Sequence, residues 1–422
     1  MTEQERRLNA ATAQERLDAL RTIAAQAQAV PTQAANVNNH IHTTYSFSPY
    51  SPSMALWQAR GSGLVTAGIM DHDSIAGAQE FLQAGRILHM GITCGLECRV
   101  SFRESPFFDR RINNPDQNGV VYMSLHGVPQ RAFAEVQAFF TPYREARNRR
   151  NRAMVARLND LLRPYDMALD FDRDVLPLSQ WAQGGAVTER HLTMALAQAM
   201  AARFGRGQTL LAFVEGTMGL SVGDKLRAQL ADAQNPYYDY DLLGLFKSHL
   251  VPRFYIGADD ECPPVRDVLA LAERTGSAST YAYLGDVGNS VTGDKRTQAF
   301  EDGFLDELMD FLSDLGFRAV TYMPTRNTPA QLARLRALCQ QHGFFQVSGE
   351  DINSPRQSFL CEALKNPEFA NLIDATWALI AHERLSNDDP SKGLFSATSI
   401  AHWPVIEDRV AAFAEMGRKL EL

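Results

Sequence analysis

The run that decides the fold is NVNNHIHTTYS, at residues 36–46. It begins like a short strand and ends in polar residues, and it carries His40 and His42 two positions apart. Because side chains alternate along a strand, both imidazole rings point to one face, where together they can bind one cation. The pair alone is a weak signal, since two structural or surface histidines give the same pattern.

Six more strand-like runs follow along the chain. They are LVTAGIMDHDS (64–74), ITCGLECRV (92–100), VVYMSLHG (120–127), ASTYAYLGD (278–286), FRAVTYMP (317–324) and FFQVSGEDIN (344–353). Helix-like segments lie between the first three strands, and the alternation resumes after a long helical stretch. This alternation predicts a parallel sheet or an α/β barrel.

The spacing of apolar residues predicts four regions. An N-terminal helical extension covers residues 1–30, and a barrel is built from 31–140 and 276–360. A helical insertion covers 141–275, and a C-terminal helical region covers 361–422.

The composition narrows the class of protein. The chain has 422 residues and a net charge of −8, which argues against a long nucleic acid or an anionic membrane surface as partner. The sequence has no run of about 18 apolar residues, so it predicts no membrane span. Five scattered cysteines favour a reducing compartment, so we expect a cytoplasmic protein. The oligomeric state cannot be read from the sequence.

Most of the first strands, and the last, end in residues that can bind metal. These residues are His40, His42, Asp71, His72, Glu97, His126 and Asp351. In β/α barrels the carboxyl ends of the strands carry the chemistry. Imidazole and carboxylate together suit Zn, Mn or Fe rather than Ca. Two such metals, about 3.5–4 Å apart, can clamp the oxygens of a phosphoryl group.

The order and spacing of these motifs resemble the PHP superfamily (polymerase and histidinol phosphatase) over residues 37–360. The matching motifs are HIHTTYS (40–46), DHD (71–73), GLE (95–97), His126 and SGEDIN (348–353). The Arg-rich segment 144–162, followed by TERHLTMAL (188–196), is similar to the nucleotide phosphatase branch with an inserted helical subdomain.

The resemblance implies a fold, an activity and a set of site residues. The fold would be a distorted (β/α)7 barrel with a helical insertion and extra terminal helices. The activity would be metal-dependent hydrolysis of a small phosphorylated metabolite or nucleotide. The implied metal ligands are His40, His42, Glu97 and Asp351 in a first site, with His126 and His72 in others. His191 or Asp71 would handle the proton, and Arg147, Arg150 and Arg190 would bind substrate.

Three positions depart from the family pattern. Phe47, Tyr283 and Asn353 stand where the family carries metal ligands. Asp286 and Asn353 are the candidates to replace them, and we expect one or two metals per chain. Two alternatives stay open: a degenerate PHP domain that binds metal or a ligand without turnover, and a metal-dependent enzyme that cleaves another bond, such as an amide.

Overall fold

The computed structural model describes residues 2–287 and 298–421 and is built around one seven-stranded sheet. The strands lie side by side in chain order: β1 (Val37–Ile41), β2 (Thr66–His72), β3 (Gly91–Ser101), β4 (Val120–His126), β5 (Ala278–Ala282), β6 (Ala319–Tyr322) and β7 (Phe345–Ser348). Each lies within one of the predicted strand-like runs or overlaps it, so all seven strand predictions are confirmed.

The sheet curls until its two ends meet. Just beyond β7, Ile352 forms a parallel bridge with Ile41 of β1. The His42 N–H donates to the Ile352 carbonyl at 2.9 Å, and the Ile352 N–H donates to the His40 carbonyl at 3.1 Å. The fold is therefore a mixed α/β structure with a curled sheet, consistent with a distorted barrel.

One strand runs against the others. β4 is antiparallel to both β3 and β5, whereas all other neighbouring strands are parallel. The prediction of a parallel sheet is wrong for β4. The physical reason lies in residues 102–119, which join β3 to β4 without a helix. A connection without a crossover returns the chain in the opposite direction.

A register shift in β1 determines which face of the sheet carries the side chains of His40 and His42. Val37 pairs with Thr66 of β2, but Ile41 pairs with Ile69, so β1 holds one more residue than β2 over this stretch. Because side chains alternate, the shift places His42 on the same face of the sheet as His72. That face is the interior of the barrel.

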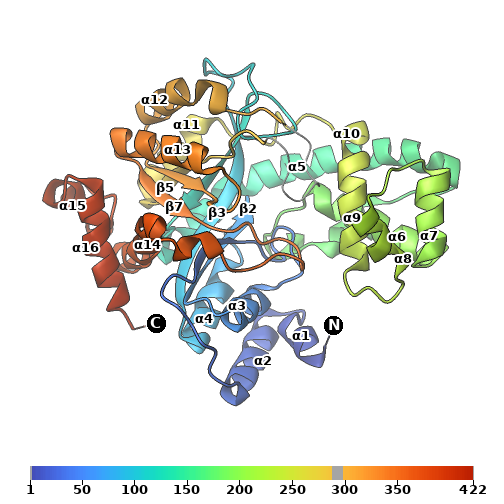
Figure 1. Cartoon of the computed structure of the whole chain (residues 1–422), viewed down its shortest axis with the longest axis horizontal. Helices are drawn as coiled ribbons and strands as arrows, with labels where there is room; N and C mark the ends of the chain where they lie inside the picture. Colours follow the sequence, from blue (N-terminus) through green and yellow to red (C-terminus); the bar gives the residue numbers. More distant parts are fainter. Residues whose placement is uncertain (1, 288–297, 422) are drawn as a thin grey trace.

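Helices cover the outside of the sheet (Figure 1). They are α3 (Pro52–Gly61), α4 (Ala78–Leu88), α11 (Val265–Thr275), α12 (Leu305–Leu315) and α13 (Pro329–His342). The N-terminal helices α1 (Glu3–Leu8) and α2 (Ala13–Gln26) pack beside α3 and α4. A buried ion pair fastens α2 to α4: Arg16 Nε lies 2.9 Å from Glu80 Oε1.

The insertion stands to one side of the sheet, and α5 runs between the two parts (Figure 1). It contains α5 (Phe133–Leu162), α6 (Glu189–Phe204), α7 (Gln208–Ala212), α8 (Asp224–Ala231), α9 (Tyr238–His249) and α10 (Val251–Phe254). These helices bury a separate apolar cluster that includes Leu158, Leu196 and Phe246. The insertion therefore has a core of its own.

The C-terminal helices are α14 (Ala370–Asp388), α15 (Ala397–His402) and α16 (Ile406–Arg418). Ala378 and Leu379 of α14 are buried together with Ala278, Ala319 and Phe345, the first residues of β5, β6 and β7. α14 therefore closes the amino-terminal end of the barrel. Within the described ranges, no helix combines the length and apolarity that crossing a membrane requires.

Candidate metal centre

Five side chains meet at the carboxyl end of the sheet. His40 Nε2 lies 3.2 Å from His42 Nε2, and His42 Nε2 lies 3.2 Å from Asp351 Oδ1. His72 Nδ1 lies 3.2 Å from Glu97 Oε2, which is 4.0 Å from His40 Nε2. Ligand atoms of His40, His42 and Glu97 all lie within 4.8 Å of one another. Four segments distant in sequence thus bring five predicted ligands into one cluster.

The charges of this cluster suit a divalent cation. Burial lowers the pKa of His40 to about 4 and that of His72 well below its usual value, so both rings are neutral and keep a free lone pair. Burial raises the pKa of Glu97 to about 8. Burial opposes the charged form of Asp351 too, but the hydrogen bond and charge of His42 hold its pKa well below the usual range. The same carboxylates raise the pKa of His42 against the effect of its burial, so a cation would have to displace a proton from this ring. Imidazoles beside carboxylates are a donor set that suits Zn, Mn or Fe.

Asp71 supports the cluster from behind. Its Oδ1 accepts hydrogen bonds from the Thr43 N–H and the Ser46 hydroxyl, both at 2.6 Å, and its Oδ2 accepts from the Thr43 hydroxyl at 2.6 Å. Ser46 Oγ also lies 3.2 Å from His42 Nδ1. This geometry favours a role in orienting His42 over the predicted proton transfer, because both carboxylate oxygens are already occupied.

Gly349 lets the chain after β7 pass against His40. A Cβ atom added at Gly349 would lie 2.5 Å from the Cβ of His40 and 2.6 Å from its backbone nitrogen. Any residue type with a Cβ atom at this position would displace His40 or the chain after β7. The glycine thus holds Asp351, two residues later, at the cluster.

His126 lies near the cluster although β4 is reversed. It follows Leu125, whose partner on β3 is Leu96, so it is level with the strand position two residues before Glu97. Burial, followed by the charge of His40, lowers the pKa of His126 to about 3, and its Nε2 has no hydrogen-bond partner among the residues that the structure describes. Its role as a metal ligand stays a prediction. Tyr122, opposite Arg99 of β3, lies further along the sheet, with its ring 6.2 Å from the ring of His72.

The proposed replacement ligands are engaged elsewhere. Asp286 Oδ1 accepts the Phe300 N–H at 2.6 Å, which commits this carboxylate to the loop after β5. The Tyr283 hydroxyl donates to Asp302 Oδ1 at 2.5 Å. Asn353 donates from Nδ2 to Asp351 Oδ1 at 2.6 Å. Asn353 therefore contacts Asp351, a predicted ligand, and the geometry does not support Asn353 as a ligand itself. The geometry does not support Asp286 as a ligand either.

Arg147 and Arg150 are buried in an internal ion-pair network. Arg147 pairs with Asp73 and, through Nε at 3.0 Å, with Glu261 Oε1. Arg150 pairs with Glu189 and, through Nε at 2.5 Å, with Glu261 Oε2. Both guanidinium groups are satisfied by carboxylates of the chain itself. The predicted contacts with substrate therefore have no support, and the two arginines tie α5 to the barrel and to α6.

The sequence reasoning missed Lys247. Tyr240 and Leu243 of α9 pack against Phe47, in the loop that follows His42. Lys247 lies one turn beyond Leu243 on the same helical face and is exposed to solvent. The nearby charge of Arg190 lowers the pKa of Lys247 to about 8. Arg190 bonds to Asn353, which bonds to Asp351, and Lys247 lies within electrostatic range of Arg190 and Asp351. Two cations of the insertion are thus near the barrel mouth, where the Asp351 side chain is 42% exposed.

His191 lies at the start of α6, as predicted. Its ring packs edge-on against Phe47 with centroids 5.0 Å apart. Burial lowers its pKa to about 3, so the ring is neutral near physiological pH. A neutral ring of this kind donates a hydrogen bond more readily than it delivers a proton.

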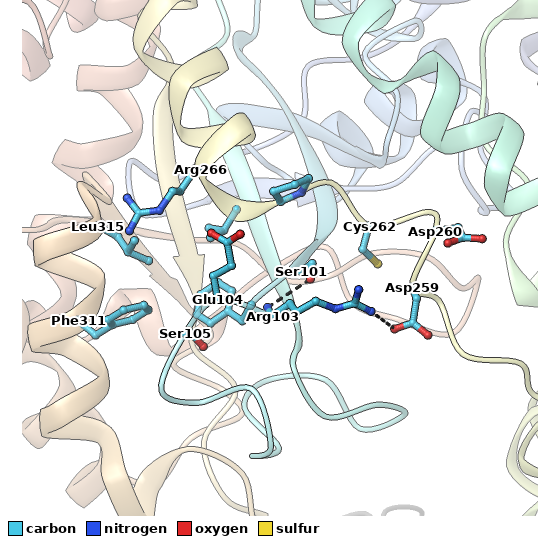
Figure 2. A pocket seen from close by; sticks show the side chains of 13 residues that line it. Ser101, Arg103, Glu104, Ser105, Asp259, Asp260, Cys262, Arg266, Phe311 and Leu315 are labelled. Carbon is cyan, nitrogen blue, oxygen red and sulfur yellow. Dashed lines mark hydrogen bonds and ion pairs between the residues drawn. The ribbon is translucent and has the colours of Figure 1, made fainter.

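A separate cavity of about 230 Å³ opens at the far end of β3 (Figure 2). Its charged side chains partly pair with each other, as Arg103 does with Asp259 at 3.9 Å. Among the residues the structure describes, its lining includes none of the predicted site residues. We therefore place the candidate site at the barrel mouth.

Comparison with known proteins gives a fold-level likeness. No protein-family model and no curated protein matches the chain. A Bifidobacterium adolescentis protein, provisionally assigned as a metal-dependent phosphoesterase, is 20% identical, with 79% of this chain and 96% of that chain covered and a TM-score of 0.49. An amidohydrolase from Chromobacterium violaceum, with bound sulfate and no metal, is 15% identical, with 77% and 89% covered and a TM-score of 0.49. Similarity at this level is too weak to transfer either activity.

Proposed function

We propose that this chain is a metal-dependent hydrolase of the PHP type that cleaves small phosphate monoesters. One observation carries the proposal: Arg190 of the insertion is connected through Asn353 to Asp351 of the histidine–carboxylate cluster, and Lys247 lies within electrostatic range of both Arg190 and Asp351. A substrate between these groups meets metal ligands on one side and fixed positive charge on the other. An anionic ester fits that arrangement, because it is attracted by both.

The residues divide into three tasks. His40, His42, Glu97 and Asp351 would hold a divalent cation, with His72 beside them. Such a cation polarises phosphoryl oxygens and makes water a nucleophile near neutral pH.

The second and third tasks fall to groups around the ligands. Arg190 and Lys247 would bind the phosphoryl oxygens, and Asn353, which accepts from Arg190 Nη1 at 2.6 Å, would position the guanidinium. Asp71 and Ser46 orient His42. The insertion would cover the mouth and limit access of bulk water.

The alternatives predict different results. An amidohydrolase with a neutral substrate gains nothing from two cations at the mouth. A degenerate domain would keep the metal but release no product. The test is phosphate release from a panel of monoesters with added Mn or Zn, run beside a panel of amides.

The control is the double variant His40→Ala, His42→Ala, with His402→Ala as a matched exposed histidine. We expect release by the wild type and by His402→Ala, but not by the double variant. Equal release by all three proteins, or activity on amides only, would overturn the proposal. Metal analysis of protein purified without chelator should give one or two equivalents per chain, and three would contradict the assignment of the ligands.

A further inference from the structure

A cavity of about 310 Å³ lies between the loop after β1 and the insertion. Its lining includes the apolar or aromatic side chains of Phe47, Leu178, Met194, Pro236 and Tyr240. Phe47 and Met194 are buried. A cavity of this volume and lining holds one or two fused rings.

The walls of the cavity are flat and aromatic. The ring of Phe47 stands at 89° to the ring of His191, with centroids 5.0 Å apart. The centroid of the Tyr240 ring lies 6.0 Å from that of Phe47. Met194 adds a polarisable thioether. Aromatic walls with a nearby sulfur bind a planar ring better than a flexible alkyl chain of equal area.

Two hydrogen-bonding groups in this lining have no partner among the residues that the structure describes. The Thr188 N–H donates to His191 Nδ1 at 3.0 Å, so the ring proton of the neutral histidine is on Nε2 and can be donated. Thr44 Oγ1 is buried and has no hydrogen-bond partner within the part of the chain that the structure describes. A buried hydroxyl without a partner is rare in proteins and indicates a missing contact. Both groups could bind a polar atom on the ring.

Two residues that line the cavity are close in the chain to residues of the metal cluster or of its hydrogen-bond network. Thr44 follows His42 by two residues, and His191 follows Arg190 directly. Arg190 bonds to Asn353, which bonds to Asp351. The cavity is therefore lined by residues that adjoin those supporting the cluster in the chain, Thr44 on the strand side and His191 on the insertion side.

We propose that this cavity is the subsite for the alcohol part of the substrate and that it accepts a planar aromatic ring. The inference rests on the proposed function, and it narrows the substrates to phosphate monoesters of alcohols or phenols that carry such a ring. Water attacks phosphorus, the bond from phosphorus to the ester oxygen breaks, and the ring-bearing alcohol leaves with a proton beside inorganic phosphate.

The test compares phenylphosphonate with methylphosphonate, which have no ester bond to hydrolyse, by calorimetry on the full-length metal-loaded chain. Burial of the ring predicts that phenylphosphonate binds about tenfold more tightly. Gln198→Trp, at an exposed position that lines the cavity, should abolish the difference and leave methylphosphonate binding unchanged. Ala202→Trp, exposed on the same helix and outside the lining, is the control and should keep it.

The outcomes separate this inference from the proposed function. Tighter binding of phenylphosphonate, blocked by Gln198→Trp, without release of phosphate from any ester would support the subsite and refute phosphatase activity. Release of phosphate with equal binding of the two probes would refute the subsite alone. No binding of either probe would refute the subsite too.

Discussion

Arg190, at the start of α6, donates a hydrogen bond from Nη1 to Oδ1 of Asn353 at 2.6 Å. Asn353 donates in turn to Oδ1 of Asp351 at 2.6 Å, and the same Asp351 oxygen lies 3.2 Å from His42 Nε2. The insertion is therefore connected to the metal cluster through two hydrogen bonds. Any movement of α6 changes the surroundings of Asp351, a candidate metal ligand.

Arg190→Gln should raise KM for a phosphate monoester by about ten- to hundredfold, since a hydrogen bond to a charged group contributes about 1.5–3 kcal/mol. The reason is the loss of a cation that binds the phosphoryl oxygens. Asn353→Ala should have a smaller effect that does not add to that of Arg190→Gln, because the two residues act through one contact. Steady-state kinetics of both variants and the double variant measure this, and fully additive effects would contradict the coupling.

Lys247→Gln should raise KM by about tenfold and weaken the salt dependence of kcat/KM, because it removes an exposed charge that attracts the substrate. Lys225→Gln is the matched control, since Lys225 is also exposed on the insertion but lies on α8. Kinetics at two ionic strengths distinguish the variants. The same response from both lysines would mean that Lys247 acts only through overall charge.

Gly349→Ala should weaken metal binding by about ten- to hundredfold, the usual cost of disturbing the support of a ligand. The added methyl group would overlap His40 and push it from the cluster. Gly216→Ala is the control, since nothing lies within 4 Å of a Cβ at Gly216. Metal titration followed by calorimetry compares the two. Wild-type affinity in Gly349→Ala would show that His40 is not a ligand.

Glu261→Gln should lower the free energy of unfolding by about 3–5 kcal/mol, because it leaves buried guanidinium groups without their partner. Glu261 pairs with Arg99, Arg147 and Arg150 and is 2% exposed. Glu215→Gln removes a pair with Arg227 at the surface and should cost about 1 kcal/mol or less. Urea unfolding of both variants gives the comparison, and equal losses would refute a special role for the buried network.

His382 should make the fold sensitive to acid. Burial lowers the pKa of His382 from an ordinary 6.5 to about 4, so between these values the unfolded chain binds the proton more strongly. Stability is complete above pH 6.5 and falls as the pH drops towards 4, by at most about 3 kcal/mol from this group. His382→Asn keeps an acceptor for the Leu394 N–H and should reduce the slope of unfolding free energy against pH over that range. An unchanged slope would exclude His382 as the cause.

The sequence predicted the strands and the core of the cluster well. Strand-like runs with ligand types at their ends are local signals, and the ends of parallel strands meet at one edge of a sheet. These signals singled out His40, His42, Glu97 and Asp351 as possible ligands, and the resemblance to the PHP superfamily grouped them into one site.

The failures concern interactions between distant segments. The direction of β4 depends on how the loop 102–119 returns, and no local pattern reveals that, so β4 was predicted to be parallel. The arginines of α5 look like a phosphate-binding set in sequence. Their partners Glu189 and Glu261 lie far along the chain, so the internal pairing was invisible. Lys247 was missed because its position depends on the packing of α9. Leu243 of this helix packs against Phe47, and this contact brings Lys247, one turn later, towards the barrel.

The contact of His42 with Asp351 has a consequence for how the chain matures. One residue follows the first strand and the other follows the last, so the cluster cannot exist until the whole sheet has been synthesised and closed. Contacts between such distant segments form late in folding, since their loop entropy must be overcome first. Metal would therefore load only onto a finished chain, and its binding energy would lock the closure of the sheet rather than start its assembly.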